Sequence, residues 1–209
     1  VPEQRALADA PAIAMQNLGK TEVAQRDIPQ SVIVFGAPGI KVSDPEFRAA
    51  QVMNYTLGGG GFASRMMKEI RAKRGLTYGV STGFATERLA EYFYGGMATD
   101  NKTAGQAFDL AKAEIQKFRD GGITDEELAD AKAYLTGSFA LRFDSNAKIS
   151  NILLSYYLQG FDKDYASKRN AEIEAVTKEQ VNAAAKRLLD PAQLYTVIVG
   201  KPEGVTPTP

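Results

Sequence analysis

The stretch LGGGGFASRMMKEIRAKRGLTYGV, residues 57–80, decides the fold because it joins a helix end, a turn, a second helix and the start of a strand. Four consecutive glycines at residues 58–61 break the preceding helix, since glycine is unfavourable inside a helix. Three apolar residues at helical spacing then form the face of a second helix: Phe62, Met66 and Ile70. Gly75 is expected to cap that helix in the left-handed conformation, and a strand starts at Tyr78. Two short helices therefore flank a glycine turn.

Upstream of this stretch, the sequence predicts one strand and one helix. The run SVIVF at residues 31–35 is apolar and rich in β-branched residues, which predicts a strand that is buried on both faces. Asp44 followed by Pro45 has the form of an N-cap with proline at the first helical position. The helix that they begin is expected to run to about Leu57, where the glycines stop it.

Downstream, the pattern changes from strands to helices. Residues 78–86 and 91–99 have strand composition and are separated by a polar turn, so we expect them to pair antiparallel and to extend the sheet. From residue 104 to residue 118, apolar side chains recur at intervals of three and four. That spacing indicates a long amphipathic helix.

Capping boxes mark the starts of two later helices. Thr124 begins a T-x-x-E box and Thr177 a T-x-x-Q box, in which side chains satisfy the first free N–H groups of a helix. A last strand is predicted at residues 194–199. This order of elements predicts an α+β fold, with a mostly antiparallel sheet and helices packed on one face.

The chain is expected to hold a single domain. Residues 31–200 carry all the elements above except an edge strand, to which a proline-bearing linker leads within residues 1–30. Residues 201–209 are predicted to be a tail. The first residue is Val1 and not methionine, which suggests a processed or excised piece of a longer parent.

Composition excludes several classes of function. The 209 residues include 25 basic and 25 acidic side chains, so no overall field favours nucleic acid or an anionic membrane. No apolar run is long enough for a transmembrane helix, and no signal peptide is recognisable. We expect a soluble protein, and the composition suits the cytoplasm and the periplasm alike.

The chain contains no histidine and no cysteine. Nearly every catalytic zinc site uses at least one imidazole ligand, so this chain is not expected to bind a catalytic metal by itself. Four acidic residues near a predicted helix start are interpreted as complements of the helix dipole, not as a metal or acid–base site: Asp125, Glu126, Glu127 and Asp130. Three basic residues are interpreted as solvated or as complements of the opposite helix end: Lys68, Lys73 and Arg74.

Residues 57–80 resemble the C-terminal, non-zinc domain of the pitrilysin/insulinase family of zinc metallopeptidases. That family includes mitochondrial processing peptidase and the core proteins of the respiratory cytochrome bc complex. The glycine tract, the helix, the I-R-x-K-R-G-L-x-Y stretch and the strand start occur in the same order. Weaker similarity covers nearly the whole chain, including GGITDEEL at residues 121–128.

In that family two homologous domains close around an extended peptide. One carries the zinc motif H-x-x-E-H, and the other carries an arginine and a tyrosine seven residues apart, which Arg71 and Tyr78 match. The resemblance implies that these two are catalytic residues that act at the partner's zinc site, hold the substrate backbone and stabilise the tetrahedral intermediate. Gly59, Gly60 and Gly61 are expected either to form a hinge or to let the peptide backbone pass closely, and so to bind substrate.

The resemblance implies the substrate-binding half of a bacterial-type zinc metalloendopeptidase. Because H-x-x-E-H is absent, the chain is not expected to be catalytic alone, and zinc is expected in a homologous domain that is either fused or a separate subunit. The alternative is a non-catalytic structural or peptide-binding subunit with the same fold. An autonomous hydrolase would need a metal held by carboxylates only. In isolation, the chain could homodimerise through the face that normally meets its partner.

Overall fold

The centre of the fold is a five-stranded sheet in the order β1-β5-β2-β4-β3. The computed structural model describes residue 11, residues 13–87 and residues 89–208. The strands are β1 (Thr21–Gln25), β2 (Gln30–Pro38), β3 (Thr77–Glu87), β4 (Ala90–Asp100) and β5 (Tyr195–Gly200). All neighbouring strands pair antiparallel except β1 and β5, which are parallel. The predicted antiparallel pairing of the third and fourth strands is confirmed.

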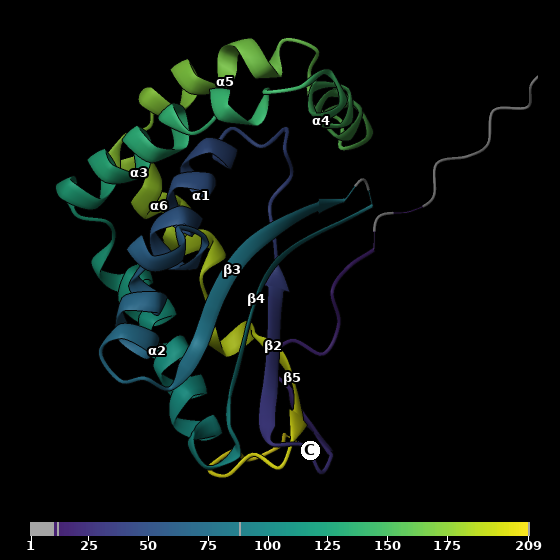
Figure 1. Ribbon diagram of the computed structural model, residues 1–209, viewed down its shortest axis with the longest axis vertical. Coiled ribbons are helices and arrows are strands. Elements are labelled where there is room, and N and C mark those ends of the chain that lie inside the picture. The colour runs from purple at the N-terminus through teal and green to yellow at the C-terminus, as the bar shows by residue number, and fades with distance from the viewer. Residues whose placement is uncertain (1–10, 12, 88, 209) are drawn as a thin grey trace, which may run out of the picture.

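The helices lie on one side of this sheet, as Figure 1 shows. The α-helices are α1 (Phe47–Asn54), α2 (Ala104–Gly121), α3 (Asp125–Gly137), α4 (Asn146–Leu158), α5 (Tyr165–Glu174) and α6 (Lys178–Leu188). Two π-helical segments, η1 (Tyr55–Gly59) and η3 (Met67–Ala72), surround the short 3₁₀ turn η2 (Gly61–Ala63). Three other 3₁₀ turns are η4 (Asn101–Thr103), η5 (Ala140–Arg142) and η6 (Pro191–Gln193). The predicted α+β class is confirmed.

The strand predicted to be buried on both faces is buried on one face only. Along β2, Ile33 and Phe35 are 0% and 1% exposed, whereas Val32 and Val34 are 43% and 53% exposed. Successive side chains of a strand point to opposite faces, and the described helices cover only one of them. The prediction was wrong because an apolar run does not reveal whether both faces have a covering layer.

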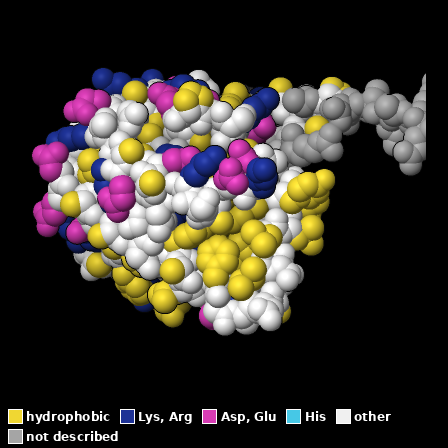
Figure 2. Space-filling view, turned by 90° about the horizontal axis from the view of Figure 1, so that it is seen from above, with side chains coloured by type: hydrophobic (Ala, Val, Ile, Leu, Met, Phe, Trp, Pro, Cys, Tyr) yellow, Lys and Arg dark blue, Asp and Glu magenta, His cyan; other side chains and the backbone are white. Residues whose placement is uncertain are grey.

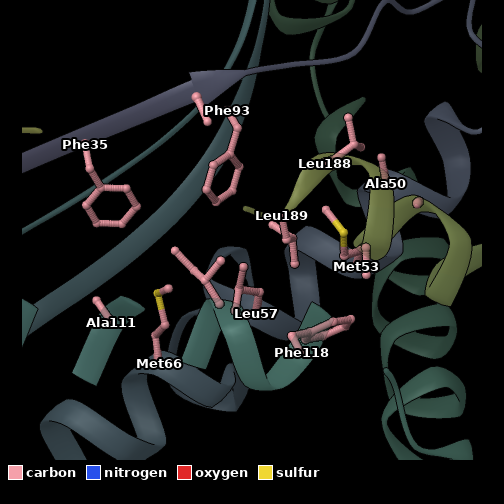
Figure 3. Packing of buried hydrophobic residues seen from close by; sticks show 14 of the residues in the cluster. Phe35, Ala50, Met53, Leu57, Met66, Phe93, Ala111, Phe118, Leu188 and Leu189 are labelled. Atoms are coloured by element: carbon pink, nitrogen blue, oxygen red, sulfur yellow. The ribbon is translucent and has the colours of Figure 1, made fainter. Parts of the chain in front are cut away.

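The core lies between the sheet and the helices. Phe35 and Phe93 point from the sheet toward Leu57, Met66 and Phe118 of the helical layer (Figure 3), and all five side chains are fully or almost fully buried. Full burial of one such side chain contributes roughly 1.5–3 kcal/mol. The predicted long amphipathic helix is confirmed as α2, whose Ala107, Ala111 and Ile115 face the same core.

Helices begin and end at the predicted caps, except that the first helix begins two residues later than predicted. Thr124 and Thr177 each form a complete capping box, as predicted. The first helix begins at Phe47 and not at Pro45, because an Asp44 carboxylate oxygen accepts a hydrogen bond from the Glu46 amide in a turn before the helix. Gly75 has the expected positive φ of 64°.

Candidate functional site

The glycine tract packs tightly against the sheet. A side chain on Gly58 would lie 2.5 Å from the Thr82 hydroxyl oxygen and 2.9 Å from the Thr82 amide nitrogen, so only glycine fits there. The side chain of Asn54 fastens the same contact, since its Nδ2 donates to the Thr82 carbonyl and its Oδ1 accepts from the Thr82 hydroxyl. The start of the tract thus fixes η1 to β3.

The rest of the tract faces outward. Gly59 and Gly61 are exposed, and nothing lies within 4 Å of a side chain built on Gly61, whose φ is 56°. The Gly60 amide closes the π-helical turn by donating to the Tyr55 carbonyl at 2.8 Å. The tract therefore exposes its backbone at Gly59 and Gly61, next to Gly58, which is fixed against β3.

Arg71 and Tyr78 lie side by side. The Gly75 amide donates to the Arg71 carbonyl at 2.8 Å and the Leu76 amide to the Ile70 carbonyl at 3.0 Å, which reverses the chain after η3. This turn returns Tyr78 to Arg71, whose guanidinium carbon lies 4.5 Å from the centre of the tyrosine ring. Tyr78 is 86% exposed, so its hydroxyl reaches solvent.

Phe62 joins Arg71 and Tyr78 in one cluster, and this position of Phe62 was not predicted from the sequence. Its ring centre also lies 4.5 Å from the Arg71 guanidinium carbon, so two aromatic rings contact the same cation. Phe62 was predicted on the buried face of a helix and is exposed instead, because it belongs to the turn η2 and not to η3. The prediction was wrong, and no periodicity of the sequence would have placed this ring beside Arg71.

The other cations near Arg71 are used within the fold. Lys73 and Arg74 both form ion pairs with Glu69, at 2.7 and 3.0 Å. Hydrogen bonds from Lys73 and then from Arg74 lower the pKa of the Glu69 carboxyl below its usual value. Among the described residues, Arg71 has no carboxylate within 4.0 Å. Its guanidinium, held by aromatic rings, remains free to bind an acceptor outside this chain.

Arg65, six residues earlier, has a purely structural role. Its Nε and Nη2 donate to the two carboxylate oxygens of Glu127 at 2.7 and 2.6 Å, and Nη2 also donates to the Gly122 carbonyl. Its guanidinium carbon lies 4.4 Å from the ring centre of Phe118. Glu127 therefore takes part both in the capping box of α3 and in an ion pair with Arg65, two residues before η3.

The described residues do not offer a zinc site. No group of three or more His, Cys, Asp or Glu side chains among them is arranged to hold a metal ion. Within the same residues, no helix has the length and apolar character needed to cross a bilayer.

Comparison with known proteins identifies the family of this chain. Residues 7–135, more than half of the chain, match the family described as the peptidase M16 inactive domain. Two relatives are a non-peptidase homolog from Helicobacter pylori, 30% identical over 77% of this chain and 37% of its own, and an uncharacterized zinc protease from Streptomyces coelicolor, 28% identical over 86% of this chain and 39% of its own. The chain thus spans about two fifths of the length of these relatives.

A solved structure gives the same assignment. The crystal structure of a peptidase M16 inactive domain from Pseudomonas fluorescens superposes with a TM-score of 0.85 and 30% sequence identity, over 99% of this chain and 49% of that one. The resemblance to the non-zinc domain of the pitrilysin/insulinase family is thereby confirmed. On sequence and on fold, the chain belongs to the family of peptidase M16 inactive domains.

Proposed function

We propose that this chain is the substrate-binding half of a zinc metalloendopeptidase, and that Arg71 and Tyr78 are its catalytic residues. The observation that carries the proposal is the position of Arg71: partly exposed, with its guanidinium carbon 4.5 Å from the centre of the Tyr78 ring, and without a carboxylate of its own among the described residues. A structural arginine would be expected to have such a partner.

The chemistry of the pair suits the stabilisation of an oxyanion. A guanidinium offers a rigid fork of N–H donors that stays charged, and a phenol donates one hydrogen bond without charge at neutral pH. Donors aimed at a developing oxyanion each contribute on the order of 10²–10³ in rate. Gly59, Gly60 and Gly61 lie near this pair in sequence, and their lack of side chains gives an extended peptide room to pass close to the backbone, which is exposed at Gly59 and Gly61.

The zinc and the general base come from a partner in this proposal. That partner is a homologous domain with the H-x-x-E-H motif, either in the same parent chain or in a separate subunit, and the greater length of the relatives leaves room for it. Apolar side chains exposed on α4 are a candidate contact surface: Leu153, Leu154, Tyr157 and Leu158. Apolar side chains also gather in one patch in the view onto the end of the molecule where α4 and α5 lie (Figure 2). Without the partner, a second copy of this chain covers the same surface.

The test is turnover in a mixture of this chain with its zinc-bearing partner. Arg71→Ala is expected to lower kcat about 10²–10³-fold and Tyr78→Phe at least about tenfold, since each removes a donor at the oxyanion. Lys73→Ala is the matched control, because Lys73 is an exposed cation of the same segment that pairs with Glu69. Unchanged peptide cleavage by both site variants would disprove the assigned roles.

A second candidate is a structural or peptide-binding subunit without turnover. The name of the Helicobacter pylori relative, a non-peptidase homolog, favours it. The two functions differ in two observables: whether the parent chain or an adjacent coding region contains H-x-x-E-H, and whether the assembled protein hydrolyses peptides. Retention of peptide binding with no cleavage, in the presence of stoichiometric zinc, would select the second candidate.

A further inference from the structure

A cavity of about 590 Å³ lies between the glycine turn, β3 and the helices α4 and α5. This volume is typical of a site for a small molecule or a few side chains. Gly59, at the open part of the glycine tract, is one of its lining residues. The described lining includes arginine, amide and hydroxyl groups, but no aspartate or glutamate.

Two arginines give this cavity a positive charge that the fold does not neutralise. Arg169 is only 5% exposed, and its Nη1 donates to two uncharged acceptors, the Leu135 carbonyl at 2.9 Å and the Asn170 side-chain oxygen at 3.0 Å. Arg142 also lines the cavity and is exposed. In the described part of the chain, neither arginine has a carboxylate within 4.0 Å.

The burial of Arg169 disfavours the charged form of its guanidinium. Burial lowers the pKa of its guanidinium, and the nearby charge of Arg142 acts in the same direction. Proteins bury charged groups only with compensation, which here comes in part from the Phe139 ring at 4.4 Å. A buried cation that faces a cavity without its own counter-charge is typical of an anion site.

Arg48 shows that this region can supply a counter-charge where the fold needs one. Its guanidinium carbon lies 4.6 Å from the ring centre of Tyr165, another residue of the cavity lining. Yet Arg48 pairs with Glu172 at 2.7 Å, on α5. The absence of such a partner at Arg142 and Arg169 is therefore a local property of the cavity and not of the whole helical layer.

We propose that this cavity is a subsite for a peptide carboxylate, either an acidic side chain or the C-terminal carboxylate, which Arg142 and Arg169 bind. The inference rests on the proposed peptide-binding function and names a substrate class for it: peptides with a negative charge a few residues from the segment that passes Gly59. An arginine fork binds a carboxylate through two parallel hydrogen bonds. The lining amides and hydroxyls supply further donors to the same group.

The experiment measures peptide binding to the full chain by titration calorimetry, with no zinc-bearing partner present. Three peptides of one length are compared: one with glutamate and an amidated C-terminus, one with glutamine and a free C-terminus, and one with glutamine and an amidated C-terminus. At least one charged peptide is expected to bind about tenfold more tightly than the neutral one, since charge-assisted hydrogen bonds are lost in the latter. The tighter of the two identifies the source of the carboxylate.

Variants then assign the effect to the two arginines. Arg142→Gln, at an exposed position, and Arg169→Gln are each expected to reduce the preference for charged peptides to less than about threefold. Lys148→Gln is the matched control, because Lys148 is a cation on α4 that pairs with Asp144 and is not a lining residue. Arg142→Gln alone decides the matter if Arg169→Gln does not fold.

Three results would overturn the proposal: no binding of any peptide, equal affinity for all three, or a preference that survives Arg142→Gln or vanishes in Lys148→Gln. The outcome is separable from the roles of Arg71 and Tyr78. Arg71→Ala is expected to keep the preference for charged peptides, whether or not that substitution changes cleavage in the assembled enzyme.

Discussion

Arg65 and Arg71 lie six residues apart in one helical segment and have opposite surroundings. Arg65 is held by Glu127, by the Gly122 carbonyl and by the Phe118 ring, all parts of the same fold. Arg71 is held by two exposed aromatic rings and by no carboxylate among the described residues. The difference suggests how to separate a structural cation from a candidate functional one: Arg65 finds its acceptors inside the chain, whereas Arg71, to which we assign a function, is positioned by rings and has no described carboxylate partner.

The strongest test of this comparison is the removal of Arg65. Arg65→Ala leaves Glu127 in a mostly buried position without its bidentate partner, and such a loss is strongly destabilising. We expect the free energy of unfolding to fall by about 2–3 kcal/mol, less than for a fully buried pair. Urea unfolding followed by far-ultraviolet circular dichroism measures it, and a loss below that of an ordinary surface substitution would contradict the structural role.

The pH dependence of the stability that Glu127 contributes is a second test of the structural role of the Arg65–Glu127 pair. Burial by itself raises the pKa of this carboxyl, but hydrogen bonds from Arg65 and Thr124 outweigh burial, so its pKa in the folded protein is below its usual value. A lowered pKa contributes stability that is present above the unfolded-state value and is lost as the pH falls through the folded-state value. We expect Glu127→Gln to cost about 1–2 kcal/mol at pH 7 and progressively less from pH 5 to pH 3. If the difference in free energy of unfolding between the parent protein and Glu127→Gln does not decrease on acidification, the charge of Glu127 is not its cause.

Substitution of Phe62 is expected to have a smaller effect, on the positioning of Arg71 and not on stability. Because its ring contacts the Arg71 guanidinium at an exposed position, Phe62→Ala removes a positioning contact of about 0.5–1 kcal/mol. Under the proposed function, we expect kcat of the mixture with the zinc-bearing partner to fall about two- to fivefold with KM nearly unchanged, and Phe62→Tyr to restore it. Rescue by tyrosine separates positioning by an aromatic ring from a general change of the surface.

The smallest expected effect is that of Arg71→Ala on stability. No described carboxylate loses a partner, and exposed substitutions of this kind are usually within about 0.5 kcal/mol of the parent protein. Urea unfolding of Arg71→Ala beside Arg65→Ala makes the comparison direct. If both variants lose equal stability, then Arg71 is structural as well and the contrast fails.

Local signals predicted much of the fold. The threonine capping boxes and the spacing of apolar residues in α2 are interactions between residues close in sequence, so the sequence displays them directly. The exposed face of β2 was missed because burial depends on layers supplied by distant segments. The pairing of Arg65 with Glu127 was missed for the same reason, since 62 residues separate the partners.

In the candidate site too, the part formed by residues close in sequence was predicted and the part formed by distant segments was not. Arg71 and Tyr78 were singled out by the resemblance of residues 57–80 to a family motif, and the short turn between them brings them together. The cavity with Arg142 and Arg169 had no such motif, because its walls come from helices and a strand that meet only in the folded chain. No spacing rule applies to residues assembled in that way.

The position of β5 affects how the chain folds. β5 lies between β1 and β2, although it is the last strand in sequence, and among the described strands β1 pairs only with β5. Residues 21–25 therefore have no partner until residues 195–200 have been synthesised and have crossed the sheet. Closing so long a loop costs entropy, and pairing between distant segments is slow. We expect insertion of β5 to be a late folding step, before which β1 and one edge of β2 are open to aggregation.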